Sequence, residues 1–258
     1  MPLPKLGKQA KRIDRRTLQF MDYLKAALPA PPGSMGYSSK VPLPWPMMLN
    51  DILGDCVPAA AGHMVEEWTA NTGKVVTPRD AAILKAYEDV GGYVKGDPST
   101  DNGCVMLDML NYWRQVGVAN HKILAYAELP LAQSGPWERT MPAGFEYSTW
   151  LFGNVFLGIQ LPISAQGQSV WSVPPGGPVD DGSPGSWGGH CVPIVGYGGT
   201  GVQVVSWGQK LNVTWNFLWA YADEAYAVLS SDWIAASGQA PNHFDLAALE
   251  ADLQKITQ

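Results

Sequence analysis

A chain of 258 residues with 46% hydrophobic and 16% charged residues can bury a sizeable core, which excludes an intrinsically disordered protein. The net charge of −6 argues against nucleic acid as a partner of the body of the protein. Three cysteines without a CxxC pair fit neither a disulfide framework nor a structural zinc site, so no metal and no other cofactor is expected.

Positive charge is concentrated in the first 16 residues, which carry a net charge of +5 and leave −11 for the rest of the chain. Such an arm is typical of a solvated tail, and it also suits docking on the acidic surface of a protein assembly. Apolar residues at helical spacing predict a helix over 14–28, and proline and glycine predict an extended strap up to residue 46. We assign residues 1–45 to this basic arm, helix and strap.

Helices dominate the next part of the sequence. One is predicted from Cys56 to Thr72, with Asp55 as its N-cap and Pro58 in its first turn. A second is predicted over 77–90, and a third follows the turn at 97–103 and ends at Gly117. This pattern indicates a helical lobe over about 46–125.

The second half is rich in strands, and the change predicts an α+β fold. Strands are expected near 122–127, 154–161, 190–197, 201–207 and 225–229. A long loop of glycine, proline and serine over 165–189 leads to His190. The main domain is placed at 46–235, with a β lobe over about 126–235 and a C-terminal helical extension over 236–258.

The sequence contains no candidate membrane segment. No run approaches the ~18 apolar residues that span a bilayer, and the N-terminus lacks the apolar core of a signal peptide. We therefore expect a cytoplasmic protein without membrane contact.

Cys56 stands where a helix is predicted to begin. The thiolate is the nucleophilic form of cysteine, and the free N–H groups of a helix start favour that form and can bind an oxyanion. Gly54 allows close backbone approach, whereas the carboxylate of Asp55 disfavours the thiolate unless it caps the helix. Cys104 and Cys191 have no such context and are expected to be packing residues. Cys56 is therefore the candidate nucleophile.

His190 is the candidate base for this thiol. Two glycines precede it, and it opens an apolar strand that ends in Gly-Tyr-Gly. His63 returns to nearly the same helix face as Cys56, but a rise of ~1.5 Å per residue places it ~10 Å away along the axis, beyond a hydrogen bond. His63 is expected to be structural, and His121 and His243 lie in polar loop sequences.

With these residues placed, the chain resembles the papain-like cysteine peptidase superfamily. The segment Gly189-His190-Cys-Val-Pro-Ile-Val-Gly-Tyr-Gly is similar to the family's histidine strand, and Val205-Ser-Trp-Gly to its Asn-Ser-Trp-Gly. Asn50-Asp-Ile-Leu-Gly-Asp-Cys56 is similar to the family's Gln-Gly-x-Cys-Gly-Ser-Cys, and Asn102-Gly103-Cys104 to its Asn-Gly-Gly loop. The matches keep the family order over about 45–230. They imply a two-lobed α+β fold with the cysteine at the start of a central helix and an antiparallel β-rich C-terminal lobe.

The resemblance implies roles for the reacting groups. Cys56 would be the nucleophile, His190 the general base and acid, and Asn50 the oxyanion-hole amide. Valine at 205 replaces the family's asparagine, which orients the imidazole, and valine cannot accept that hydrogen bond. Gln203, on the same strand face as Val205, is the expected replacement, and a group from the 176–189 loop is the alternative.

The resemblance also implies a substrate-binding group. Asn102 and Gly103 would line the cleft and pair with an extended peptide backbone. Trp207 would shield the histidine side of the site, and Trp187 is assigned to the same binding group.

Three functions follow from these residues. The first is a peptidase or amidase that cuts a peptide or protein substrate through an acyl-thioenzyme. The second is a weakly active or inactive papain-like scaffold that acts as a structural protein, because the pattern also looks similar to papain-like proteins of phage and bacterial genomes, some of them components of the phage particle. The third is transglutaminase-type acyl transfer. No inhibitory propeptide is recognised before the domain, so an intracellular, unprocessed form is expected.

Overall fold

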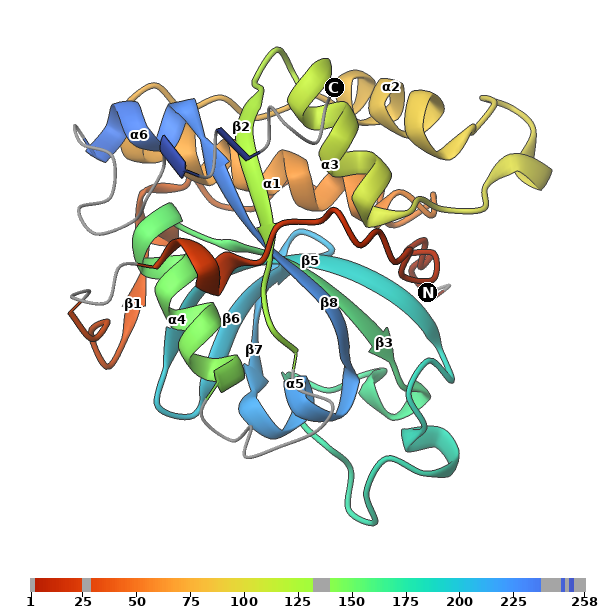
Figure 1. Cartoon of the computed structure of the whole chain (residues 1–258). Helices are drawn as coiled ribbons and strands as arrows, with labels where there is room; N and C mark the ends of the chain where they lie inside the picture. The colour runs from red at the N-terminus through yellow and green to blue at the C-terminus, as the bar shows by residue number, and fades with distance from the viewer. Residues whose placement is uncertain (1–2, 25–28, 132–139, 238–246, 249–250, 253–258) are drawn as a thin grey trace.

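The computed structural model describes residues 3–24, 29–131, 140–237, 247–248 and 251–252, and it has a helical layer above a curved sheet (Figure 1). The helical layer holds α1 (Cys56–Thr72), α2 (Asp80–Gly91) and α3 (Met106–Gln115). The fold is α+β, as the sequence predicts. None of the described helices has the length and apolar character needed to cross a membrane.

Helix α1 is the central helix of the fold. Small residues in its first turns (Ala59 to Gly62) let neighbouring segments of the protein pack closely against it, and the helix is buried from Cys56 to Ala70. It ends at Gly73, whose φ of 80° is the left-handed conformation that glycine adopts at a helix C-terminus. The side chains around α1 form one apolar cluster that includes Cys191 of the facing sheet, so the helix start lies between the two layers.

The sheet forms the lower layer in the order β2-β8-β3-β5-β6-β7-β4, with β1 paired to β5. All pairs are antiparallel except β4 with β7. The strands are β1 (Met35–Gly36), β2 (Ile123–Glu128), β3 (Val155–Leu161), β4 (Val170–Trp171), β5 (Gly188–Gly198), β6 (Gly201–Ser206), β7 (Gln209–Thr214) and β8 (Ala222–Ser230).

Alternation along the strands separates two cores. Val192 and Ile194 of β5 and Val202 and Val204 of β6 belong to a cluster inside the curved sheet. Cys191, one residue out of phase, belongs to the cluster around α1. His190 has the parity of Val192, so the strand directs it toward the interior of the sheet.

The arm and the ends of the chain differ from the sequence prediction. The helix predicted over 14–28 is wrong in the described part, which holds only the 3-10 turn Phe20–Tyr23. Met21 is 41% exposed there, because the segment packs through Phe20 and through a backbone hydrogen bond to β2 instead of through a helical stripe. Most of the predicted 236–258 extension lies outside the described residues. Helices α4 (Thr140–Phe152), α5 (Trp215–Tyr221) and α6 (Ser231–Ser237) were not predicted.

Candidate active site

Cys56 is the first residue of α1 and is only 1% exposed. Its sulfur accepts hydrogen bonds from the backbone N–H groups of Gly7 and Cys191. Burial raises the pKa of the thiol to about 12, and these two N–H groups do not offset it. In this conformation Cys56 is a neutral thiol at pH 7.

The residue before it, Asp55, does not cap the helix. It is fully buried, and its Oδ1 accepts a long hydrogen bond of 3.3 Å from Nδ2 of Asn50. Burial raises the pKa of this carboxyl well above its usual value, and a negative charge on Asp55 in turn raises the pKa of the Cys56 thiol. Asn50 Nδ2 also donates to Leu53 O at 3.4 Å, so its amide is engaged within its own loop.

His190 lies fully buried on β5, opposite Ile159 of β3. Its Nε2 shares a hydrogen bond of 2.8 Å with Oγ of Ser206. Gln203, the replacement expected from the sequence, does not fill this role: its Nε2 donates to Asn212 Oδ1 in a separate surface pocket. The reason is the alternation of side chains along β6. Ser206 lies on the same face as Val202 and Val204, whereas Gln203 and Val205 lie on the opposite face, where Val205 is buried in a separate apolar cluster.

Tryptophans enclose the imidazole. Trp207 stacks on His190 with ring centroids 4.5 Å apart and planes at 15°, and Trp171 meets it edge-on at 6.3 Å. Trp187 lies against Trp207 at 5.5 Å. This burial lowers the pKa of His190 to about 3, so the ring is neutral at pH 7.

The two candidate reacting groups are not hydrogen-bonded to each other in this conformation. The Nδ1 atom of His190 is buried without a hydrogen-bond partner among the described residues. His63, the rival base, is occupied elsewhere: its Nε2 lies 2.9 Å from Pro46 O, and burial lowers its pKa to about 4. The structure therefore holds a neutral cysteine and a neutral histidine on the two facing layers. No group of three metal-binding side chains occurs among the residues described.

Removal of the Ser206 hydroxyl gives a direct test of this arrangement. Ser206→Ala is expected to lower the free energy of unfolding by about 1–3 kcal/mol, because it leaves a buried imidazole nitrogen without a partner. Urea denaturation measures the loss. Ser172→Ala, which removes a hydroxyl from the partly exposed segment after β4, is the control and should change stability by less than about 0.5 kcal/mol. An equal effect of both variants would contradict the assigned role of Ser206.

The N-terminal arm runs between the helical layer and the sheet (Figure 1). Cys104 N donates to Gly7 O at 2.7 Å, and Gln9 N donates to Cys104 O at 2.9 Å, so the arm pairs with the loop before α3. On the opposite wall, Lys8 N donates to Gly189 O at 3.0 Å. An extended backbone therefore bridges the cleft directly over Cys56.

Residues predicted to bind substrate line this path. Backbone carbonyls of Asn102 and Gly103 accept hydrogen bonds from Nε2 of Gln9 at 3.1 and 3.2 Å. The start of the arm reaches a hollow of about 240 Å³ that Leu3 and Pro4 share with Trp187 and Trp207. The arm of the chain itself therefore occupies the hydrogen-bonding groups of Asn102 and Gly103.

Glycines make the cleft narrow enough to hold a bare backbone. A Cβ atom added to Gly7 would overlap Gly54 O, and one added to Gly103 would overlap Gly7 O. On the other wall, a Cβ at Gly189 would overlap Lys8 O. We call the passage bounded by Gly54, Gly103 and Gly189 the glycine slot. The atoms that line the slot belong to the backbone. Another extended peptide with a small residue at the position of Gly7 can therefore form the same main-chain hydrogen bonds.

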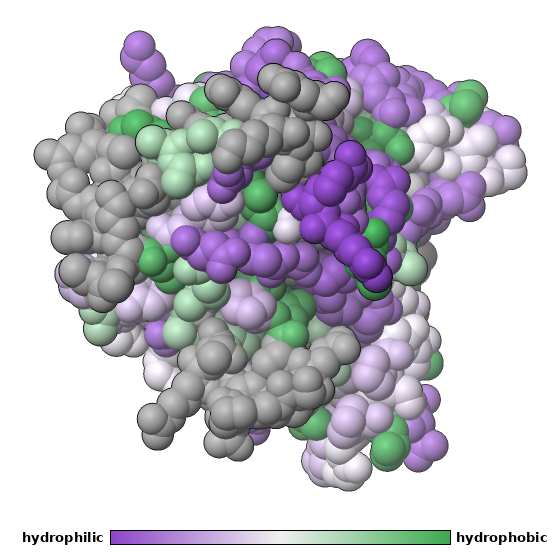
Figure 2. Space-filling model, viewed as in Figure 1, coloured by the Kyte–Doolittle hydropathy of each residue, from purple (hydrophilic) through white to green (hydrophobic). Residues whose placement is uncertain are grey.

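Ion pairs hold the N-terminal arm against the body of the protein along its length. Its basic residues pair with acidic residues of the body, and the space-filling view shows a hydrophilic band along this path (Figure 2). The pairs are Lys5–Asp101, Lys8 with Asp223 and Glu224, Lys11–Glu128 and Arg12–Asp108. The arm is thus docked on acidic groups of its own chain.

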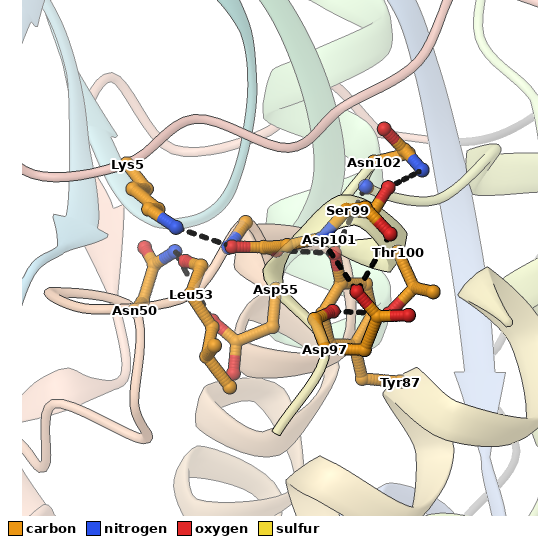
Figure 3. Close-up of polar contacts among 12 residues, drawn as sticks. Lys5, Asn50, Leu53, Asp55, Tyr87, Asp97, Ser99, Thr100, Asp101 and Asn102 are labelled. Carbon is orange, nitrogen blue, oxygen red and sulfur yellow. Dashed lines mark hydrogen bonds and ion pairs between the residues drawn. The ribbon is translucent and has the colours of Figure 1, made fainter. Parts of the chain in front are cut away.

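Asp101 connects the arm to the helix start (Figure 3). Its carboxylate accepts hydrogen bonds from Lys5 Nζ at 2.6 Å, from Tyr87 OH at 2.6 Å and from Gly54 N at 2.8 Å. Burial alone would raise the pKa of this carboxyl, but these three donors hold it below its usual value. The carboxylate of Asp101 therefore links the arm, α2 and the loop that precedes Cys56.

A cysteine at the start of a central helix, a histidine on the facing sheet and a cleft between two lobes are the defining arrangement of the papain-like fold. Comparison with solved structures agrees. Xylellain, a cysteine protease from Xylella fastidiosa, is similar with a TM-score of 0.64 and 14% identity over 89% of this chain and 98% of its own. The proCathepsin B S9 from Trypanosoma congolense gives 0.56 and 11% over 88% and 87%, and the proform of the ragweed protease Amb a 11 gives 0.55 and 16% over 79% and 67%. The chain thus has a papain-like fold. No protein-family model and no curated protein sequence matches it.

Proposed function

We propose that the protein is a papain-like cysteine hydrolase of peptide or amide bonds, with Cys56 as nucleophile and His190 as general base and acid. The observation that carries the proposal is the extended peptide backbone, its own arm, that is held in the cleft over Cys56 by Gly189 and Cys104. A cleft that binds one extended backbone through main-chain groups has the means to bind a substrate in the same place.

The chemistry requires the site to rearrange. Once the arm leaves, His190 Nδ1 would take the thiol proton as the sulfur attacks the substrate carbonyl, and would return that proton to the leaving amine. Water would then release the acyl group from Cys56. Ser206 supports this role because its hydroxyl holds the other ring nitrogen of His190.

The docked arm supports a latent form of this hydrolase. Its backbone excludes substrate, and the thiol and imidazole beneath it are both neutral. Two of the similar solved structures are, by their names, proforms of cysteine proteases. An arm that blocks the cleft departs from the sequence expectation that no inhibitory segment precedes the domain.

One observation favours a second function, that of an inactive scaffold. Cys56 and His190 are uncharged and share no hydrogen bond in the described structure, as expected of a fold kept for binding alone. In that case the protein would serve as a structural or interaction protein, for example in a phage particle, and its basic arm could exchange its own acidic sites for those of a partner.

Labelling of Cys56 separates the two functions. We expect a peptidyl electrophile to modify Cys56 ahead of Cys104 and Cys191, and Cys56→Ala to lower hydrolysis of a denatured protein substrate by at least about 10³-fold. Cys104→Ala, which removes a second buried thiol that does not begin a helix, is the control and should retain turnover. The scaffold function would be favoured if neither labelling nor turnover were found in the wild type or in a variant whose arm is displaced.

A further inference from the structure

Lys8 occupies a pocket of its own beneath the glycine slot. Its side chain is fully buried, and Nζ lies 2.8 Å from Asp223 Oδ2 and 2.9 Å from Glu224 Oε1. Its third polar contact, at 3.1 Å, is to the carbonyl of Gln9, which belongs to the arm. The body of the protein therefore supplies two carboxylates to one buried ammonium group.

The pocket is shaped for a long unbranched side chain. Gly158 forms one wall, because a Cβ atom there would overlap Lys8 Cε and would crowd Glu224 Cγ and Met106 Sδ. The carboxylates are oriented from outside the pocket: Gln160 Nε2 donates to Asp223 Oδ2 at 2.6 Å, and Tyr226 OH donates to Glu224 Oε2 at 2.9 Å. These partners belong to β3 and β8, so the pocket persists when the arm leaves.

One buried oxygen in this pocket is left without a hydrogen bond. Asp223 Oδ1 has no partner among the described residues, whereas the only charged partner of the fully buried Glu224 is Lys8 Nζ, at 2.9 Å from Oε1. An isolated carboxylate is costly to bury, so a cation bound in this pocket stabilises it.

From this geometry we infer that the pocket formed by Met106, Gly158, Gln160, Asp223 and Glu224 is a subsite for a basic side chain, and that the cleft selects peptides with lysine next to the residue that contacts Cys56. The inference rests on the proposed function, in which a peptide replaces the arm. A neutral side chain would leave the buried carboxylate of Glu224 and the partly buried one of Asp223 without a cation, and an acidic side chain would add a like charge, so both are rejected.

Filling the pocket with a small cation tests its selectivity without any turnover. In the full chain, Lys8→Ala removes the part of the side chain that n-propylammonium can replace. We expect saturating n-propylammonium to raise the Tm of this variant by about 3 °C more than that of the wild type, because the ligand binds only the folded state. Neither 1-propanol nor sodium chloride at equal concentration should have this effect, and Glu224→Gln added to Lys8→Ala should remove it.

The same comparison holds if Lys8→Ala does not fold in buffer alone. The yield of refolded protein should then rise with n-propylammonium and not with 1-propanol. An equal response to the cation and the alcohol, in either measurement, would overturn the inference.

Peptide binding tests the subsite in its functional setting. The probe is the arm sequence Leu-Pro-Lys-Leu-Gly-Lys-Gln, compared with a copy in which norleucine replaces its second lysine. On the full chain carrying Lys8→Ala and Cys56→Ala, we expect the lysine peptide to bind about 30-fold more tightly, the lower end of the effect of removing one partner from a buried charge pair. Equal affinities would overturn the inference.

These binding measurements do not depend on hydrolysis. If the wild-type protein shows no turnover but the cation and the lysine peptide bind selectively, the hydrolase function fails and the subsite stands. If turnover occurs with no preference for lysine over norleucine, the hydrolase stands and the subsite fails.

Discussion

Replacing Gly7 with alanine is expected to expel the arm from the glycine slot and to raise the alkylation rate of Cys56 by about 5- to 150-fold. The added Cβ would overlap Gly54 O, which is main chain and has little room to move. Overpacking of this kind costs about 1–3 kcal/mol, and that energy acts on the equilibrium between the docked and released arm. Mass spectrometry of iodoacetamide-treated protein, resolved by cysteine, measures the rate.

The pH dependence of the alkylation rate of Cys56 should also change in Gly7→Ala. Burial raises the pKa of Cys56 to about 12 in the docked state, so the wild-type thiol stays neutral and slow to react through neutral pH. Release of the arm exposes the sulfur to water, so Gly7→Ala should react at lower pH than the wild type. Gly33→Ala is the matched control, because a Cβ at Gly33 meets no atom within 4 Å. Equal rates in Gly7→Ala and Gly33→Ala would show that the arm does not protect Cys56.

Asp101→Ala is expected to lower the free energy of unfolding by about 2–4 kcal/mol and to loosen the arm at the same time. The substitution removes a buried carboxylate that accepts from Lys5, Tyr87 and Gly54, and hydrogen bonds to charged groups are the stronger ones. Urea denaturation measures the stability, and alkylation of Cys56 measures the loosening.

The effect of Asp101→Ala should depend on pH. Because the folded protein lowers the pKa of Asp101, this carboxylate stabilises the fold above its unfolded pKa of 3.8, and the contribution is lost as pH falls through the lowered value. The difference between the wild type and Asp101→Ala should therefore shrink in strong acid. Asp51→Ala, in the exposed part of the loop before α1, is the control. A loss of stability as large for Asp51→Ala as for Asp101→Ala would refute the assignment.

Local patterns predicted the elements that carry the candidate dyad. Helix α1 begins at Cys56 and ends at Thr72 as predicted, because apolar periodicity and a terminal glycine both act within the segment. The strand of His190 was recognised from its buried run, although β5 begins two residues earlier. Strand β7 was missed because most of its residues are polar, and the alternation of Leu211 and Val213 with them is too short to stand out.

The details of the site depend on contacts that no short segment encodes. Ser206 was missed as the partner of His190, although the alternation of Val202 and Val204 was the available signal for its interior direction. The position of the arm was missed for a stronger reason. Lys8 meets Asp223 and Glu224 across more than 200 residues of sequence, and nothing in the arm itself specifies those partners.

The arm is a tethered ligand, and this determines how the cleft can open. Beyond the slot the chain is fixed again where Glu128 N donates to Leu18 O at 2.7 Å and Phe20 is fully buried, so only a short linker separates the two attachments. Short linkers give effective concentrations in the millimolar range. Dilution therefore leaves the cleft occupied, and a free peptide of equal intrinsic affinity must reach about millimolar concentration to fill half the sites. Opening at lower peptide concentrations requires a change in the arm or in the ion pairs that hold it.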